Sequence, residues 1–476
     1  MSVELIVGIT IILLIALLIS EVPVAFSLGT AGTVGVLLLD GAGITATTLA
    51  RIPFQATSRY SLVIVPMFIF MGLLAMHGGL AEDVFRLGHR LLGRLPGGLG
   101  LAAILASAAF AAVSGSSVAT VATVGRTSIA EMRKYGYDTA FAAGIVGAAG
   151  TLGVLIPPSV VLVLYGIITG ESIGALLIAG IIPGLLSAVL YAAAVVLRVT
   201  RNPSLVKASI IAPPAMTGPA VTAPEATGVT AGPSSAPGGL PTAPIDGQQP
   251  IQSTAVGELW SVARVGVLFA VVVGGIYTGL FTATESAALG GFAALLMITL
   301  HLLRRSPRAL LPTVASAARE SASVTSMIFA ILVGASLFTF FLVRAGVPTA
   351  FTNAVLGIEA SPLLIVILLL LMMIPLGMAL DPISILLISV PLAHPVITEL
   401  GFDGLWFGIL TVKMIELGLI TPPVGLNAYV VAGCVEGVTV EQAFKGLSFF
   451  FSVDVLTVVL LIAFPAIVTW LPAFLR

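Results

Sequence analysis

The stretch ELGLITPPVG, residues 416–425, places Glu416 and the adjacent Pro422 and Pro423 inside an apolar run from residue 405 to residue 434. Each proline removes a backbone N–H donor and its ring obstructs the carbonyl of the preceding helical turn, so the pair should interrupt a helix. In hydrocarbon, each backbone group left without a hydrogen bond costs several kcal/mol. Such a break is tolerated in a membrane only where it is buried in protein or lines a cavity. The sequence therefore predicts a functional site at this break.

The composition indicates a membrane protein with several spans. Of its 476 residues, 58% are hydrophobic and only 9% are charged, whereas soluble domains carry about 25% charged residues. One cysteine excludes a disulfide framework, and the four histidines have no metal-ligand spacing. The first 20 residues lack a basic segment and a cleavage site, so we interpret them as a retained membrane helix. We predict an all-α polytopic protein in a lipid bilayer, with no nucleic-acid partner.

Two kinds of apolar segment follow one another along the chain. A crossing helix needs about 20 apolar residues, and eight segments fit: 3–20, 22–39, 61–77, 173–197, 261–280, 284–303, 320–343 and 447–470. Segments 99–130 and 361–397 are interrupted at SGSS (114–117) and LDPIS (380–384). Their arms of about 14–18 residues are typical of re-entrant helical hairpins. Segments 140–170 and 405–434 would each form a helix of about 45 Å, longer than a hydrocarbon core of about 30 Å, and each contains a proline pair.

These interrupted segments are related to each other. TLGVLIPPS (151–159) and ELGLITPPV (416–424) align without gaps at an offset of 265. At this offset residues 136–138 (GYD) match residues 401–403 (GFD), and the two hairpin interruptions coincide. We interpret the pattern as an internal duplication in which each copy has a re-entrant hairpin followed by a broken transmembrane helix.

The distribution of basic residues predicts the orientation. Fifteen of the 20 lysines and arginines fall on one face, in loops 78–98, 131–139, 198–264, 304–319 and 435–446 and the adjoining helix ends. The other face has only Arg51, Arg59, Arg344 and Arg476, and Lys413 lies within the membrane. The positive-inside rule makes the first face cytoplasmic, so both termini lie outside and the two repeats are inverted. The linker 201–257, rich in Pro, Ala, Gly, Thr and Ser, cannot bury a core, and we expect it to be disordered.

A broken helix in a membrane has a chemical use. Its unpaired carbonyls are hard oxygen ligands suited to a small cation, and half-helix N-termini suit an anion. The candidate cation ligands are Ser114, Ser116 and Ser117 beside Gly150, Thr151 and Gly153 in one copy, and Asp381 and Ser384 beside Gly418 and Thr421 in the other. Two alternatives stay open: the small residues of SGSS could serve close helix packing, and a proline can simply kink a helix.

Ionisable residues at membrane depth are functional candidates because their burial is costly. Asp381, at a hairpin tip, could ligate sodium or carry a proton. Glu416 and Lys413 are three residues apart on one helix and could pair with each other. Glu285 is interpreted as a helix-start residue near Thr282 or Thr284, and no role is predicted for Asp454.

Five stretches together resemble one family. They are PMFIFMGLLAMHGGLAEDVFRLGHRLLGRLPGGLG (66–100), SGSSVATVATVGRTSIAEM (114–132), AGTLGVLIPPSVVLVLYGIITG (149–170), TATESAA (282–288) and LGLITPPVGLNAYVVAG (417–433). This set is similar to the large membrane subunit of tripartite ATP-independent periplasmic (TRAP) transporters. The resemblance covers nearly the whole chain except the linker 201–257.

The resemblance implies an elevator-type secondary transporter of the ion transporter superfamily, driven by sodium and without another cofactor. By this resemblance, sodium is held between each hairpin tip and its broken helix. The first sodium site then comprises Ser114, Gly115, Ser116, Ser117, Gly150, Thr151, Gly153, Pro157 and Pro158. The second comprises Gly377, Asp381, Ser384, Gly418, Thr421, Pro422 and Pro423, and the substrate cavity includes Thr120, Ser159, Glu416 and Asn427.

The family also implies partners: a small four-helix membrane subunit and a periplasmic substrate-binding protein. Because only two helices precede PMFIFMG, we expect the small subunit to be a separate chain. The expected function is sodium-coupled, binding-protein-dependent import of an organic anion, most often a carboxylate, across a bacterial or archaeal cytoplasmic membrane. A stand-alone sodium/carboxylate symporter of the same superfamily is the alternative, and a channel is a third possibility. An intramembrane enzyme using Ser116 or Asp381 is disfavoured, since neither has a partner base or second carboxylate.

The expected organisation alternates scaffold and transport segments. It comprises 1–98 (scaffold helices and an amphipathic connector), 99–170 (first transport repeat), 171–200 (scaffold helix), 201–257 (linker), 258–360 (scaffold helices), 361–434 (second transport repeat) and 435–476 (C-terminal helix).

Overall fold

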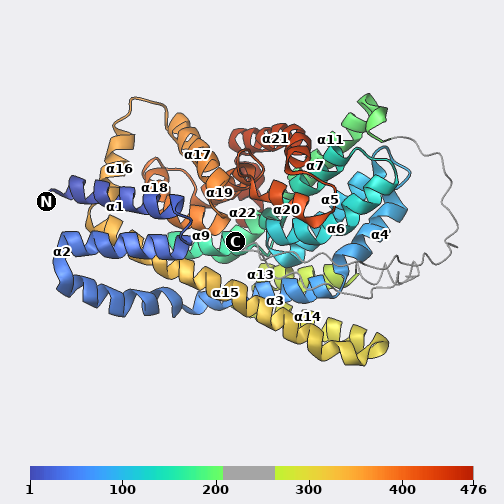
Figure 1. Ribbon diagram of the computed structural model, residues 1–476, viewed down its shortest axis with the longest axis horizontal. Coiled ribbons are helices and arrows are strands. Elements are labelled where there is room, and N and C mark those ends of the chain that lie inside the picture. Colours follow the sequence, from blue (N-terminus) through green and yellow to red (C-terminus); the bar gives the residue numbers. More distant parts are fainter. Residues whose placement is uncertain (207–262, 475–476) are drawn as a thin grey trace, which may run out of the picture.

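The computed structural model describes residues 1–206 and 263–474, and this part of the chain is almost entirely helical (Figure 1). Eight of its helices are long and apolar enough to cross a membrane, or nine if one bent pair counts as a span. The all-α polytopic fold predicted from the sequence is therefore confirmed. Most of the predicted linker 201–257 lies outside the described residues.

Among the N-terminal helices, the second is longer than predicted and the others have nearly the predicted bounds. In chain order, the N-terminal helices are α1 (Val3–Ile19), α2 (Val24–Thr57), a short 3-10 helix η1 (Tyr60–Val63) and α3 (Ile64–His77). We expected the second helix to end at residue 39, but the chain passes Gly41 with a φ of 78° and resumes a helix to Thr57. Glycine adopts this positive φ without steric cost, so α2 consists of two helical parts that meet at a kink at Gly41.

An amphipathic helix connects the N-terminal helices to the first hairpin. It is α4 (Leu80–Leu92), with Glu82 and Asp83 in its first turn and His89 and Arg90 in its last. These charges complement the helix dipole. Its apolar face packs against α5 (Gly98–Ser114), the first arm of the hairpin.

The helices are interrupted at both predicted hairpin turns and at both proline pairs, although α17 and α18 are each long and apolar enough to cross a membrane. The first unit contains α5, α6 (Ser117–Lys134), α7 (Thr139–Gly150), α8 (Leu152–Leu155) and α9 (Val160–Thr169). The second contains α17 (Pro362–Ala379), α18 (Pro382–Glu399), α19 (Gly404–Leu419) and α20 (Leu426–Cys434). The bounds of α6 recur in α18 at the offset of 265, and the turn glycines Gly136 and Gly401 have φ values of 78° and 77°.

The remaining helices differ from the prediction mainly at their ends. They are α10 (Ile173–Ala179), α11 (Ile181–Arg201), η2 (Pro203–Leu205), the helix Ala263–Tyr277 with its π-helical part η3 (Ala270–Gly274) and final turn α13 (Gly275–Tyr277), α14 (Ala283–Arg305), α15 (Pro307–Arg344), α16 (Val347–Leu356), α21 (Val440–Ala463) and α22 (Ala466–Phe474). α15 begins at Pro307 instead of residue 320, and α16 was not predicted. The predicted spans 173–197 and 447–470 are each two helices.

The helix-start interpretation of Glu285 is confirmed. Thr282 precedes α14 and its hydroxyl accepts a hydrogen bond from the Glu285 N–H, while the Glu285 carboxylate accepts one from the Thr282 N–H at 2.8 Å. This reciprocal capping box satisfies two helix donors that would otherwise lack partners.

The helices pack into two groups. In one, α2 lies along α15, with α1, α3 and α14 beside them (Figure 1). Close backbone contact joins α2 and α15, because a Cβ on Gly32 would lie 2.5 Å from the Phe338 backbone nitrogen. Asp40 and Arg344 add an ion pair between these helices, with an Nε–Oδ2 distance of 2.9 Å. Small residues that let helix backbones approach are typical of membrane helix packing.

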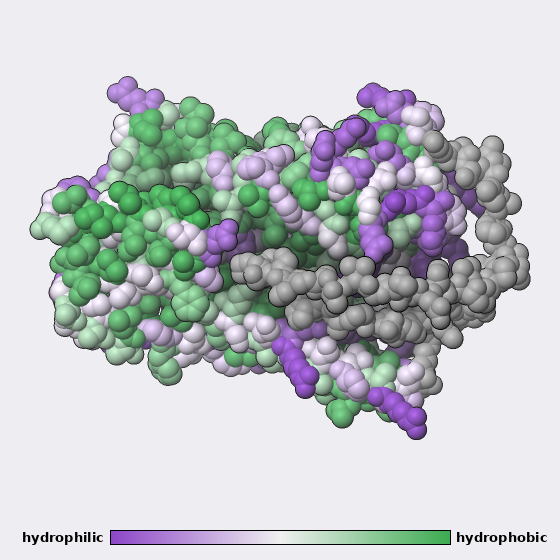
Figure 2. Space-filling view, in the orientation of Figure 1, coloured by the Kyte–Doolittle hydropathy of each residue, from purple (hydrophilic) through white to green (hydrophobic). Residues whose placement is uncertain are grey.

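The other group contains the two hairpin–break units together with α11 and α21. α7 and α21 meet where a Cβ on Gly144 would lie 2.4 Å from the carbonyl carbon of Gly446. α11 packs on α21, α5 and α8. Figure 2 shows hydrophobic surface over α1 and α2, whereas hydrophilic side chains gather around α4. Exposed apolar side chains such as Ile12 and Phe54 suit contact with lipid or with another membrane subunit.

Candidate functional site

The first broken helix is interrupted by its proline pair. The chain leaves α8 at Ile156 and resumes α9 after Ser159, and the two helical parts are bent by 41°. The Pro157–Pro158 peptide bond is cis, and all residues from 151 to 159 are buried. Neither proline can donate to the carbonyl four residues earlier, so Gly153 and Val154 lose the donors that a continuous helix would supply.

The tip of the first hairpin lies directly against this break. Gly115, at the tip, has a φ of 64°, and a Cβ there would lie 2.5 Å from the carbonyl oxygen of Pro158. A Cβ on Gly153 would lie 2.5 Å from the carbonyl oxygen of Ser116. Both contacts require glycine. The structure therefore brings the hairpin tip and the break together, with a carbonyl oxygen of each beside a glycine of the other.

Two hydroxyl groups organise the hairpin tip. The Ser116 side chain caps α6 by accepting a hydrogen bond from the Ala119 N–H at 3.3 Å. The Thr120 hydroxyl donates to the Ser116 carbonyl at 2.7 Å and lies 3.1 Å from the Ser114 hydroxyl. The predicted residues Ser114, Ser116 and Thr120 thus form one cluster at the break.

The second break has the same construction but a different environment. α19 ends at Leu419, the Pro422–Pro423 peptide is cis, and Gly425, with a φ of 47°, precedes α20. A Cβ on Gly377 of the second hairpin would lie 2.8 Å from the Cα of Gly418. In contrast to the buried first pair, Pro422 and Pro423 are exposed. The two units therefore differ in their access to the surroundings.

Asp381 occupies the position that Ser116 occupies in the first hairpin. Its carboxylate caps α18 by accepting a hydrogen bond from the Ser384 N–H at 3.2 Å, and the Ser384 hydroxyl donates to the same carboxylate at 2.8 Å. A carboxylate has about four acceptor positions, so capping leaves oxygen lone pairs for a cation. The structure brings Asp381 and Ser384 together as predicted.

Glu416 and Asn427 flank the second break and are completely buried. Within the described residues, neither oxygen of Glu416 and neither side-chain amide atom of Asn427 has a hydrogen-bond partner. The Ser117 hydroxyl lies near enough to the Glu416 carboxylate to interact with it electrostatically. Buried polar groups are almost always hydrogen-bonded, so these atoms are suited to contacts with an ion or a solute.

Lys413 does not pair with Glu416, which was one open alternative. Its ammonium group instead forms an ion pair with Asp454 on α21. Lys413 and Asp454 have exposures of 0% and 1%. A buried ammonium is stabilised only by a close acceptor, and Asp454 supplies it from a helix that the sequence did not connect with α19.

Three predicted hydroxyl groups are committed to other partners. The Thr151 hydroxyl bonds to the Ala148 carbonyl and to Tyr191, and the Ser159 side chain caps α9. The Thr421 hydroxyl donates to the Leu417 carbonyl at 2.6 Å. The Thr151 and Ser159 carbonyl oxygens also accept hydrogen bonds, from the Val154 and Val163 N–H groups at 3.4 and 3.1 Å. Tyr191 was not predicted, although a lone tyrosine within the apolar helix 181–201 is a signal for a buried hydrogen-bond partner.

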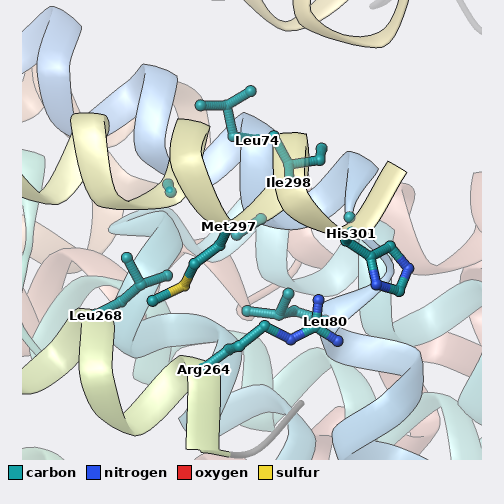
Figure 3. A pocket seen from close by; sticks show the side chains of 10 residues that line it. Leu74, Leu80, Arg264, Leu268, Met297, Ile298 and His301 are labelled. Atoms are coloured by element: carbon teal, nitrogen blue, oxygen red, sulfur yellow. The ribbon is translucent and has the colours of Figure 1, made fainter. Parts of the chain in front are cut away.

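A small cavity lies elsewhere, between α3, α14 and the helix Ala263–Tyr277 (Figure 3). Its volume is about 20 Å³ and its lining includes Leu74, Met297 and Leu268, with Arg264 and His301 at one side. This space accommodates about one water molecule. It lies outside both hairpin–break units and is too small for an organic solute.

A sequence profile of the family described as "Tripartite ATP-independent periplasmic transporter, DctM component" matches residues 11–467. The chain belongs to the DctM family. It is therefore the large permease subunit of a TRAP transporter, a multi-span membrane transporter subunit and not an enzyme.

Individual DctM relatives align over most of the chain. The C4-dicarboxylate TRAP transporter large permease protein DctM of Pseudomonas aeruginosa is 34% identical over 456 residues, which cover 94% of this chain and 92% of that protein. The sialic acid TRAP transporter large permease protein SiaM of Vibrio cholerae is 28% identical, covering 88% and 87%. The isethionate TRAP transporter permease protein DctMQ of Oleidesulfovibrio alaskensis is 30% identical, covering 96% of this chain but 64% of its own length.

The DctM fold is shared with a solved transporter structure. The crystal structure of the Alcanivorax borkumensis YdaH transporter superposes with a TM-score of 0.62, covering 89% of this chain and 90% of that one. The sequences are 13% identical. This similarity shows that the two chains share a fold.

Proposed function

We propose that this chain is the permease of a sodium-coupled importer of an organic anion, with one sodium site at each contact between a hairpin tip and a helix break. The observation that carries the proposal is the backbone contact at each break, where Gly153 meets Ser116 and Gly418 meets Gly377. A small hard cation is bound by oxygens that converge within a few ångströms, and in this proposal the carbonyl oxygens beside these contacts supply them.

The first sodium site would use the carbonyl oxygens around Gly153 with the hydroxyl oxygens of Ser114 and Thr120. The buried Glu416 carboxyl group lies beside Ser117, and its ionised form would supply negative charge next to a bound sodium ion. An unpaired buried carboxylate favours a neighbouring cation and repels an anion. We therefore assign Glu416 to attracting sodium instead of contacting the anionic solute.

The second sodium site would use Asp381 and Ser384 with the carbonyls near Gly418 and Thr421. The organic anion would lie between the two breaks, near Asn427 and the N-terminal ends of α9 and α20. These helix ends offer N–H donors and a positive dipole end to a carboxylate. The unpaired amide of Asn427 is a further donor.

We propose that the two units work as inverted repeats. The recurrence of the α6 bounds in α18 at the offset of 265 supports the duplication. The first proline pair is buried while the second is exposed, which is the asymmetry expected when one of two related sites is open. In this proposal the hairpins re-enter the membrane, both termini lie outside the cell, and the hairpin–break group moves as an elevator against the α2–α15 group.

Sodium coupling supplies the free energy for accumulation. Each net charge that enters along a membrane potential contributes about 2.3 kcal/mol per 100 mV. A transport cycle with more sodium charges than anion charges is therefore driven by the potential as well as by the sodium gradient. DctM permeases work with a small membrane subunit and a periplasmic binding protein, and we propose the same partners for this chain in a bacterial inner membrane.

Uptake by proteoliposomes tests this function. The permease would be reconstituted with its small subunit, and a labelled C4-dicarboxylate or sialic acid would be supplied together with the binding protein. We expect uptake with an inward sodium gradient and none when potassium or choline replaces sodium. Uptake that persists without sodium contradicts sodium coupling. Sodium-driven uptake by this chain alone would instead establish the stand-alone symporter.

A further inference from the structure

Four buried side chains from separate helical segments form one hydrogen-bonded network. Thr151 lies between α7 and α8 at the first break, Tyr191 on α11, Lys413 on α19 and Asp454 on α21. The Thr151 and Tyr191 hydroxyls are 2.8 Å apart, and Tyr191 donates to the Asp454 carboxylate. Lys413 donates to the same carboxylate, and its Nζ lies 3.4 Å from the Tyr191 hydroxyl. Tyr191, Lys413 and Asp454 are not among the sodium ligands proposed above, so their burial needs another explanation.

The network determines the direction of its hydrogen bonds. A tyrosine hydroxyl has one proton, and Asp454 accepts the proton of Tyr191. The Tyr191 oxygen therefore accepts from Thr151, whose single hydroxyl proton is shared between the Ala148 carbonyl and the Tyr191 oxygen. A lysine ammonium has no acceptor, so Lys413 also donates, and Asp454 is the acceptor at the centre of the network. The position of the Thr151 side chain thus depends on a charge pair between α19 and α21.

Burying the Lys413–Asp454 ion pair costs free energy of desolvation, and the pair adds little to the stability of the fold. Removing two charges from water costs several kcal/mol per ion, and a buried ion pair is often no more stabilising than apolar side chains of the same volume. The gain from such a pair is a defined geometry. Here the network fixes the position of Thr151. This residue directly precedes the single-turn helix α8 and lies two residues before Gly153, which contacts Ser116.

We propose that the Lys413–Asp454–Tyr191 network links the second broken helix to the first helix break and holds the first break in position. Through this positioning, the network determines the sodium affinity of the first site. The inference rests on the proposed function. None of the three residues touches the ion. They act through Thr151, whose placement fixes α8 and the carbonyl oxygens around Gly153.

The sharpest test removes one oxygen atom. Tyr191→Phe keeps the ring, which packs edge-on against Phe450 at 5.9 Å between centroids, and loses only the hydroxyl. The readout is the sodium concentration that half-saturates the thermal stabilisation of the purified permease complex, with choline keeping the ionic strength constant. We expect the half-saturating concentration to rise about threefold to tenfold, the equivalent of one buried hydrogen bond.

Tyr165→Phe is the matched control. Tyr165 is also fully buried and donates one hydrogen bond, to the Gly404 carbonyl at 2.9 Å, but it lies at the far half of the broken helix and outside the network. This variant should keep the wild-type sodium half-saturation. A general effect of losing a buried tyrosine hydroxyl would change both variants equally and would overturn the proposal.

The charge pair gives an independent test. Removing one partner leaves an unpaired buried charge and destabilises the fold, so the informative variant is the double substitution K413M/D454L, which removes both charges. We expect a folded complex with sodium half-saturation raised at least as much as in Tyr191→Phe. Wild-type half-saturation in a folded double variant would overturn the proposal.

The outcomes separate this inference from the proposed function. If sodium fails to stabilise even the wild-type complex, the proposed sodium sites fail. If sodium stabilises the wild type and Tyr191→Phe responds like Tyr165→Phe, the sodium sites stand and the positioning role of the network is wrong.

Discussion

Replacing Gly153 by alanine tests whether the first break and the first hairpin tip form a sodium site. The new Cβ would lie 2.5 Å from the Ser116 carbonyl oxygen and 2.7 Å from the Thr120 hydroxyl oxygen. Carbon and oxygen atoms do not approach so closely, and the nearest atom belongs to the backbone. The hairpin tip must therefore move away from α8 by several tenths of an ångström or more.

The expected size of the effect follows from the cost of overpacking. Inserting a methyl group into a well-packed site costs about 1–3 kcal/mol. If this cost falls on the ion-bound geometry, sodium affinity decreases by about fivefold to 150-fold, since 1.4 kcal/mol corresponds to a factor of ten. The movement separates the carbonyl oxygens of the site, so the loss should appear in sodium binding before it appears in folding.

The assay is the sodium dependence of thermal stability and of uptake rate, measured for Gly153→Ala and for Gly433→Ala. Gly433 is the matched control because it lies in α20 and a Cβ there would meet nothing within 4 Å. Alanine is about 1 kcal/mol better than glycine within a helix, so Gly433→Ala should be at least as stable as the wild type with unchanged sodium dependence. A folded Gly153→Ala variant with wild-type sodium half-saturation would refute the site at the first break.

Three further predictions concern the second unit and a helix cap. Gly377→Ala, whose Cβ would lie 2.8 Å from the Gly418 Cα, should weaken sodium binding by a similar factor, and normal sodium titration would contradict the second site. Asp381→Asn retains a capping side chain but loses the charge. We expect an unfolding temperature near that of the wild type and a half-saturating sodium concentration raised about tenfold or more. An unchanged sodium titration would show that Asp381 only caps its helix. Glu285→Ala loses the capping box with Thr282 and should cost about 1 kcal/mol of stability without changing sodium dependence; a changed sodium titration would show that Glu285 has a second role.

The sequence by itself determined where the helices are interrupted. A proline pair cannot belong to a continuous helix, and an apolar run of about 30 residues is too long for one crossing. These local rules place the breaks at the two proline pairs and the hairpin tips within residues 114–117 and 380–384. The structure interrupts its helices at residues 156–159, 420–425, 115–116 and 380–381. The capping role of Glu285 is equally local, since both of its partners lie within one turn.

The tertiary structure alone decided which side chains meet. Lys413 has a neighbour three residues away in Glu416, yet it pairs with Asp454 on another helix, and Thr151 is held by Tyr191. Pairing within one helix is only one of several ways to satisfy a buried charge, and the choice depends on which helices pack together. Sequence spacing carries no information on that packing, because hydrogen bonds and ion pairs act over a few ångströms in space whatever the separation along the chain.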